Sequence, residues 1–140
     1  MKVLIDTNIA LNILLKQPAF YAGSRRIFFL AETGKISGFV SASAVTDIYY
    51  IARKSLGKAA VHEAIKHLLP VFQPATVTGE SIFRALDLDW GDFEDSVQFT
   101  VGESLSVDYI ITRNTGDFSS GSIPAVTPEQ FIKIITDMSQ

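Results

Sequence analysis

Four aspartates in this 140-residue chain stand just after predicted strands or at the predicted beginnings of helices. The first follows the apolar stretch "KVLI", and the last follows "DYIITRN". They are Asp6, Asp47, Asp95 and Asp117. Carboxylate oxygens are the ligands that Mg²⁺ prefers, and this ion usually takes only one or two of them while keeping several waters. Four such acids at one place would hold one or two ions and leave positions for phosphate oxygens.

Each of these acids also has a purely structural interpretation. Asp6 and Asp47 suit the starts of helices, where a side-chain oxygen accepts from free backbone amides and a negative charge suits the helix dipole. Asp92 and Asp95 have the D-x-x-D spacing of a capping arrangement, and Asp117 belongs to a Gly-Asp pair typical of turns. The sequence leaves both interpretations open for any single acid, whereas their joint placement favours a site. Polar side chains beside the acids that could orient them are Thr7, Asn8, Thr112 and Asn114.

Strands and helices that would position these acids alternate along the chain. Strands are predicted at residues 3–5, 37–43, 71–79, 109–112 and 125–126. Helices are predicted at residues 9–15, 25–32, 45–56, 59–69, 80–86 and 93–105, and after Pro128. Pro74 marks the third strand as an edge candidate, because proline cannot donate to a central ladder. The alternation predicts a three-layer α/β/α domain with a mainly parallel sheet, whose right-handed crossovers gather the acids at one edge.

Composition limits the kind of protein that this chain can be. With 47% hydrophobic residues and no linker, repeat or apolar run long enough for a membrane span, we expect a single domain over residues 1–140. The absence of cysteine removes disulfides and thiolate metal sites, so a soluble cytoplasmic protein fits best. A net charge of −3 argues against a broad basic surface for nucleic acid. It leaves a nuclease open, because bound cations supply positive charge next to a phosphate.

Other polar and aromatic residues are interpreted as structural. Trp90 is expected to pack in a loop, and Tyr49 and Tyr50 to be buried or half-buried. Five basic residues could follow a phosphate backbone, but a solvated helical face is the favoured interpretation. They are Arg25, Arg26, Arg53, Lys54 and Lys58.

Three segments resemble the PIN domain family, most closely its bacterial VapC-like branch. They are "KVLIDTNIAL", "SASAVTDIYYIARK" and "DFEDSVQFTVGESLSVDYIITRNTGDF", which lie within residues 2–118. The resemblance implies a Mg²⁺- or Mn²⁺-dependent ribonuclease that acts on RNA, often as the toxin of a type II toxin–antitoxin pair. It further implies an antitoxin partner and a homodimer.

Carried over by motif, the resemblance gives the acids roles in metal binding and catalysis. Asp6 matches the first acid of the family, Asp95 the acid before the small residue in "EDS", and Asp117 the acid of "DF". Asp47 occupies a position where the family more often has Glu, so its shorter side chain suggests ligation through water. Asn114 stands where many relatives carry another Asp, which leaves one negative charge fewer for a second metal.

The chemistry expected of such a site follows from its charges. A cation held by Asp6 and Asp95 would neutralise the phosphodiester and lower the pKa of a bound water, the proposed nucleophile. A second ion near Asp47 or Asp117 would stabilise the leaving oxygen, and one of the carboxylates would serve as base. Asp92 is kept as a reserve ligand.

Two other functions are weighed against this one. A PIN-fold module that binds RNA or a partner protein without cleaving it is the stronger alternative, because of the departures at Asp47 and Asn114. A phosphotransferase of the haloacid dehalogenase type would want a second acid two residues after Asp6, where this chain has Asn8.

Overall fold

A five-stranded parallel sheet forms the centre of the protein. The structure is a computed structural model that describes residues 1–139. Its strands are β1 (Lys2–Ile5), β2 (Ser37–Ser41), β3 (Phe72–Ala75), β4 (Tyr109–Ile111) and β5 (Ala125–Val126). They are ordered β3-β2-β1-β4-β5, and every neighbouring pair is parallel. The carboxyl ends of β1 and β4, the two central strands that precede Asp6 and Thr112, therefore meet at the same edge.

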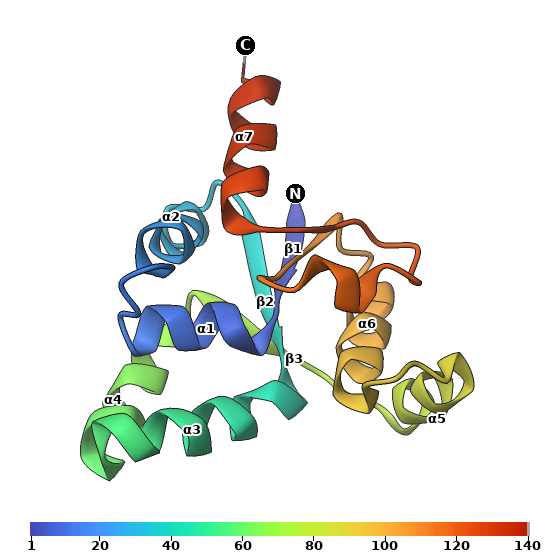
Figure 1. The fold of residues 1–140 in the computed structure, drawn as a ribbon, viewed down its shortest axis with the longest axis horizontal. Coiled ribbons are helices and arrows are strands. Elements are labelled where there is room, and N and C mark those ends of the chain that lie inside the picture. Colours follow the sequence, from blue (N-terminus) through green and yellow to red (C-terminus); the bar gives the residue numbers. More distant parts are fainter. Residues whose placement is uncertain (140) are drawn as a thin grey trace.

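Helices cover both faces of this sheet (Figure 1). They are α1 (Thr7–Leu14), α2 (Tyr21–Glu32), α3 (Ala42–Leu56), α4 (Lys58–Leu68), α5 (Gly79–Leu88), α6 (Phe93–Leu105) and α7 (Pro128–Met138), with a 3₁₀ helix η1 (Thr115–Phe118). Alternate side chains of β1 enter two separate cores, because successive residues of a strand point to opposite faces. Val3 and Ile5 pack with α1 to α4 and α7, whereas Leu4 packs with α6. The predicted three-layer α/β/α fold is confirmed.

The third strand lies at the edge of the sheet, as Pro74 predicted. Its neighbour β2 carries Gly38, where an added Cβ would lie 2.5 Å from the ring of Phe72. Glycine at this position allows the buried Phe72 to pack directly against the backbone of β2. The edge strand β3 is therefore held against β2 by packing of the Phe72 ring as well as by backbone pairing.

Several predicted boundaries and one predicted burial were wrong. The strands predicted at residues 37–43 and 71–79 are shorter, since β2 ends at Ser41 and β3 at Ala75. Helix α3 begins at Ala42 and α2 at Tyr21, so each starts before its predicted position. Asp47 consequently lies in the second turn of α3 and does not start that helix. Ala42 and Ala44, which have the highest helix propensity of any residue type, extend α3 backwards into a stretch that also suits a strand. Tyr50 is 57% exposed.

The packed position predicted for Trp90 is confirmed. Its ring centroid lies 5.0 Å from that of Phe99 and 6.3 Å from that of Phe118. Among residues 1–139, no helix combines the length and apolar character that crossing a membrane requires.

Candidate metal centre

Asp6 is a buried carboxylate at the junction of β1 and α1. Its backbone amide donates to the Ile111 carbonyl at 2.9 Å, which continues the ladder between β1 and β4. Its side chain caps α1 by accepting from the Thr7 amide at 2.7 Å. Burial raises the pKa of Asp6, although hydrogen bonds from Thr112, Gln98 and Thr7 oppose that rise. Asp6 is therefore both a helix cap and a costly buried charge.

Thr112 and Asn8 hold the second oxygen of this carboxylate. The Thr112 hydroxyl accepts from the Asn114 amide at 3.0 Å, so its own proton is free to donate to Asp6 Oδ2 at 2.8 Å. The Asn8 side-chain amide donates to the same oxygen at 3.3 Å. In turn, the Asn8 oxygen accepts from the Arg113 backbone amide at 3.3 Å. Residues that follow β4 thus fix the orientation of an acid that follows β1.

Asp95 lies in the first turn of α6. Its backbone amide donates to Asp92 Oδ1 at 3.0 Å, so Asp92 is the N-cap of this helix. Burial, and after it the negative charges of Asp92, Asp6, Asp117 and Glu94 in that order, together raise the pKa of Asp95 to about 7. Within residues 1–139, no positive side chain counts among the causes that set this pKa. The metal-free carboxyl therefore keeps its proton to a higher pH than an ordinary aspartate does.

Asp117 is an exposed acid on η1, facing Asp95 across an open cleft of about 860 Å³. The charge of Asp117 raises the pKa of both Asp6 and Asp95. The charged residues that line the cleft are all aspartates: Asp87, Asp89, Asp92, Asp95 and Asp117. Such a lining repels a nucleic acid unless cations enter with it.

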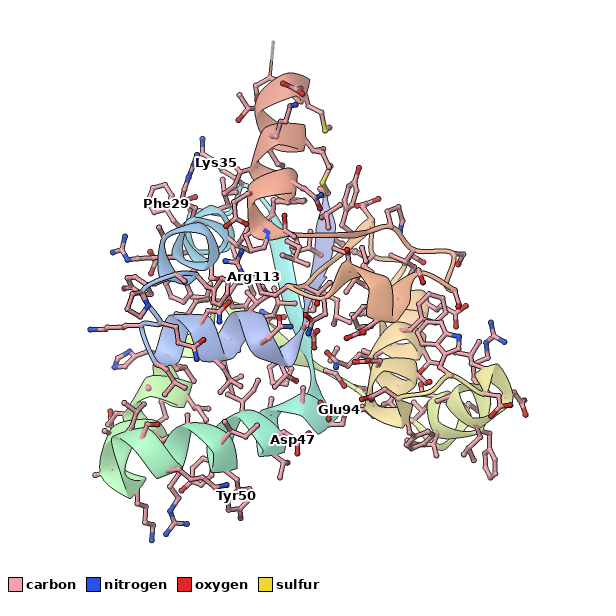
Figure 2. All side chains as sticks on the ribbon, in the orientation of Figure 1. Phe29, Lys35, Asp47, Tyr50, Glu94 and Arg113 are labelled. Carbon is pink, nitrogen blue, oxygen red and sulfur yellow. The ribbon has the colours of Figure 1, made fainter. Side chains whose placement is uncertain are left out.

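Among the described acids, Asp47 interacts with Glu94, and Glu94 in turn lies within electrostatic range of Asp95. Figure 2 shows the two side chains approaching each other from α3 and α6. The Thr7 hydroxyl donates to Glu94 Oε1 at 3.2 Å. Burial raises the pKa of Glu94, and the charge of Asp47 and a hydrogen bond between the two carboxyl groups raise it further. Sequence reasoning overlooked Glu94, although it directly precedes Asp95 in the same helical turn.

The carboxylate oxygens of these acids are the ligand type that a hard cation prefers, although the acids do not converge on one point. Within residues 1–139, no three acidic or histidine side chains come together in a metal-binding arrangement. Gln98 is 1% exposed, its side chain reaches Asp6, and its Oε1 atom has no hydrogen-bond partner among these residues. An unpartnered buried oxygen beside uncompensated carboxylates is what a Mg²⁺ site offers, since this ion needs only one or two direct carboxylates. Gln98 was also missed, and its signal is a polar side chain inside the apolar stretch "SVQFTV".

The sequence matches the family model described as PIN domain over residues 2–116. The chain belongs to the PIN domain family. The matched region includes Asp6, Asp47 and Asp95 and ends one residue before Asp117. No match to the chain was found among curated protein sequences.

Solved structures with the same fold cover most of this PIN domain. A toxin–antitoxin complex from Klebsiella pneumoniae has a TM-score of 0.68 and 19% identity, covering 90% of this chain and 97% of its own. VapBC2 from Rickettsia felis, bound to a DNA fragment from its promoter, gives 0.67 and 16%, with 90% and 97% covered. VapC20 of Mycobacterium tuberculosis, a toxin that cleaves the sarcin–ricin loop, gives 0.66 and 16%, with 86% and 95% covered. At these identities the likeness establishes the fold.

The PIN fold brings the predicted residues together to different degrees. Asp6, Asp95 and Asp117 lie within electrostatic range of one another. Asp47 is set apart from them and pairs with Glu94. Thr7, Asn8 and Thr112 contact the acids directly. The Asn114 side chain makes no hydrogen bond within residues 1–139; its backbone amide donates to the Thr112 hydroxyl, and its carbonyl accepts from the Asp117 amide at 3.0 Å.

Proposed function

We propose that this protein is a divalent-metal-dependent ribonuclease that hydrolyses RNA phosphodiesters, with residues 1–140 acting as one domain. The observation that carries the proposal is the gathering of Asp6, Asp95 and Asp117 without a compensating cation. Fold stability alone gives no reason to keep repelling carboxylates together, whereas a site for Mg²⁺ or Mn²⁺ requires them. Membership of the PIN domain family supports the same conclusion.

The roles of the residues follow from their surroundings. Asp6 and Asp95 would hold the cation, with Asp117, Asp47 and Gln98 beside them. When bound, the cation supplies positive charge to the phosphate and acidifies water. Thr112, Asn8 and the Thr7 amide orient Asp6 before any ligand arrives, so no reorganisation is needed there.

The remaining acids face the space that a phosphate would enter. Asp117 and Asp92 line the open cleft and are exposed. Either carboxylate can accept the proton of an attacking water, since it sits at the solvent boundary and can pass the proton on. Asp47 and Glu94 form a neighbouring pair of carboxyl groups, and a second ion held by them would stabilise the leaving oxygen.

We also propose that the protein is a VapC-like toxin controlled by a protein inhibitor, and that it acts as a cytoplasmic homodimer. Toxin–antitoxin assemblies among the proteins of the same fold support this view. The inhibitor should place an Arg or Lys among the acids, because a guanidinium fork satisfies two carboxylates and replaces the cation at once. A structure of the neutralised complex tests this, and an inhibitor that avoids Asp6 and Asp95 would refute it.

Cleavage of RNA by the purified protein tests the proposed activity. Products should appear with Mg²⁺ or Mn²⁺ and disappear with EDTA. Asp6→Asn and Asp95→Asn should each lower the rate at least about a hundredfold, because each removes a ligand charge and keeps the side-chain shape. Asp137→Asn, an exposed aspartate on α7, serves as the matched control and should cleave like wild type.

A catalytically inactive PIN module that binds RNA or a protein is the alternative function. The looseness of the acid cluster within residues 1–139 favours it. RNA binding without any metal-dependent products would support this alternative. Wild-type rates in both Asp6→Asn and Asp95→Asn would rule out the proposed nuclease site.

A further inference from the structure

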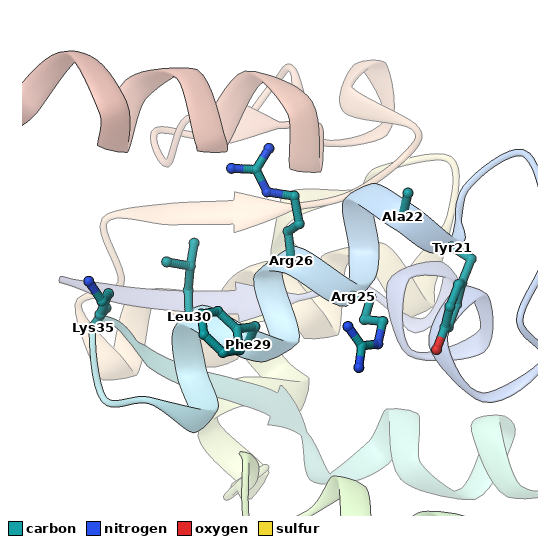
Figure 3. Close-up of a pocket in the computed structure, with 7 residues that line it drawn as sticks. All are labelled: Tyr21, Ala22, Arg25, Arg26, Phe29, Leu30 and Lys35. Atoms are coloured by element: carbon teal, nitrogen blue, oxygen red, sulfur yellow. The ribbon is translucent and has the colours of Figure 1, made fainter.

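A groove of about 630 Å³ runs along the outer face of α2. Figure 3 shows Tyr21 near one end, Lys35 at the other, and Phe29 between them. Arg25 and Arg26 leave the helix on opposite sides of this face. Phe29 is 54% exposed, so more than half of its surface faces solvent. We call this surface the α2 groove.

The positive charges of the α2 groove are unused by the fold. Arg84 and Arg113 are paired with Glu103 and Glu129 at 3.3 and 2.7 Å. Within residues 1–139, neither Arg25, Arg26 nor Lys35 forms an ion pair. Three unpaired cations on one face of a chain with a net charge of −3 make a local positive surface opposite in sign to the acidic cleft.

One end of the α2 groove lies at the same edge of the sheet as the acids. Arg113 follows β4 there, and its guanidinium donates to the Phe20 carbonyl at 2.8 Å and the Ser24 hydroxyl at 3.1 Å. The first turn of α2 is therefore attached to the carboxyl edge. Lys35 precedes β2 and lies at the opposite edge. Since a helix rises 1.5 Å per residue, the groove leads away from the site over roughly 17 Å.

We propose that the α2 groove binds a single-stranded segment of the RNA substrate that extends from the acidic cleft. This inference rests on the proposed ribonuclease function. Arg25, Arg26 and Lys35 would contact backbone phosphates, and Phe29 with Tyr21 would provide surfaces on which bases stack. The combination of spaced cations with an exposed phenylalanine and a half-buried tyrosine favours RNA over an acidic peptide, which uses the cations alone. The groove would supply the positive contacts that the acidic cleft cannot.

Binding of a labelled oligoadenylate of about 12 nucleotides, measured by fluorescence anisotropy in EDTA, tests the inference without any cleavage. Each phosphate contact with single-stranded nucleic acid contributes about 0.7 to the slope of log K against log salt. Arg25→Gln, Arg26→Gln and Lys35→Gln should each reduce the slope by about that amount and weaken binding about fivefold near 0.1 M salt. Arg53→Gln, an exposed arginine on α3 outside the groove, should change neither quantity.

Phe29→Leu separates stacking from charge. It should weaken binding about fivefold or more, because stacking of a base on an aromatic ring is lost, and leave the salt slope unchanged. Circular dichroism melts would show that the variant is folded, as expected for a side chain that is 54% exposed. An effect of Phe29→Leu on slope but not on affinity would contradict a stacking role.

The outcomes distinguish this inference from the proposed activity. If wild type cleaves RNA and all four groove variants bind RNA as wild type does, RNA binding by the α2 groove is refuted and the proposed ribonuclease activity is retained. If the groove variants weaken RNA binding but no metal-dependent cleavage occurs, RNA binding by the α2 groove is supported and the proposed ribonuclease activity is refuted. Absence of RNA binding by wild type would overturn the inference, as would groove-dependent binding of polyglutamate in its place, which would assign the surface to an acidic protein segment.

Discussion

Two polar regions lie side by side at the carboxyl end of β4, and they differ in whether their charged side chains are paired with opposite charges. Thr112 donates to a carboxylate of the acidic edge. We give this name to the acids Asp6, Asp92, Glu94, Asp95 and Asp117. The residue after Thr112, Arg113, is the centre of a network with Asn12, Ser24 and Glu129. Both regions use charged side chains from distant parts of the chain. Only one of them pairs its charges.

The Arg113 network is satisfied on nearly every donor. Arg113 Nη1 donates to both Glu129 oxygens at 2.8 and 2.7 Å, and Nε donates to Asn12 Oδ1 at 3.2 Å. The guanidinium also lies 4.9 Å from the centre of the Phe20 ring. These contacts join α1, α2, η1's preceding loop and α7. A polar region built for stability has this closed character.

The acidic edge is open by contrast. Its hydrogen bonds fix the orientation of Asp6 and cap α6, yet they leave the net charge of the acids uncompensated. Such an arrangement lowers fold stability in the absence of a ligand and is typical of functional sites. The comparison therefore teaches that the two regions should respond in opposite ways to neutralisation, pH and metal.

The largest expected effect on stability comes from disrupting the Arg113 network. Arg113→Met keeps the length of the side chain and removes its charge and donors, so Asn12, Ser24 and the Phe20 carbonyl each lose one hydrogen bond. We expect the free energy of unfolding to fall by about 2–4 kcal/mol, discounted for the exposure of Glu129. Urea denaturation measures it, and Arg53→Met, at an exposed arginine that forms no ion pair within residues 1–139, should stay within about 0.5 kcal/mol of wild type. Equal effects of the two changes would remove the distinction drawn for Arg113.

The next effect is the pH dependence of the metal-free protein. The folded pKa of Asp95 is about 7 and its ordinary value is 3.8, so between these pH values the folded state holds a proton that the unfolded state releases. The free energy of unfolding should therefore decrease as pH rises through this window. After discounting for solvent screening, we expect a decrease of about 1–2 kcal/mol in EDTA.

The Arg113 network should have the opposite pH response. Burial alone would raise the pKa of Glu129, but hydrogen bonds and charge from Arg113 outweigh it and hold that pKa below its usual 4.5. Its contribution to stability is present above 4.5 and is lost as pH falls below that value. Urea denaturation from pH 3 to 8 separates the two windows. Asp95→Asn should reduce the pH dependence of stability only in the upper range, between about pH 4 and 7. A wild type whose free energy of unfolding rises over that range would contradict the assignment to Asp95.

Much of the fold and part of the site followed from the sequence. Helix α6 (Phe93–Leu105) and strand β5 (Ala125–Val126) have the predicted bounds. Local signals sufficed there, because the D-x-x-D cap and the short apolar strand act within a few residues. The gathering of Asp6, Asp95 and Asp117 followed from the parallel topology, which places strand ends at one edge.

What the sequence did not reveal depends on contacts between distant residues. Arg113 carries no local motif, and its partners lie 16 to 101 residues away. The start of α3 was misplaced, since "SAS" suits a strand and a helix alike, and Asp47 was therefore assigned to the wrong turn. Glu94 was missed because its contact with Asp47 joins two helices that only tertiary packing brings together.

A smaller effect is the response of stability to metal. A ligand present at about ten times its dissociation constant raises the free energy of unfolding by about 1.4 kcal/mol. Wild type should gain about 1 kcal/mol in millimolar Mn²⁺ or Mg²⁺ relative to EDTA. Asp95→Asn should lose most of this gain, whereas Asp137→Asn should keep it. Thermal melts of the three proteins measure the response, and a wild type indifferent to both metals would mean that the acidic edge holds no divalent cation.

The smallest effect concerns the two carboxyl groups that sequence reasoning did not bring together. Glu94→Gln keeps the length of the side chain, and its amide can donate to Asp47 where a carboxyl group must first bind a proton. Thr7 can still donate to the remaining oxygen. We expect the metal-free variant to be about 0.5 kcal/mol more stable than wild type at neutral pH, a small gain because Glu94 is exposed to screening solvent.

Glu94→Ala provides the contrast, because it removes the repulsion and also the contact with Thr7 and Asp47. Its stability should equal that of wild type or fall slightly below it. Chemical denaturation in EDTA resolves the three proteins if they are measured in parallel. If Gln and Ala at this position destabilised the protein equally, the Glu94 carboxylate would belong with the closed region around Arg113, and the acidic edge would end at Asp95.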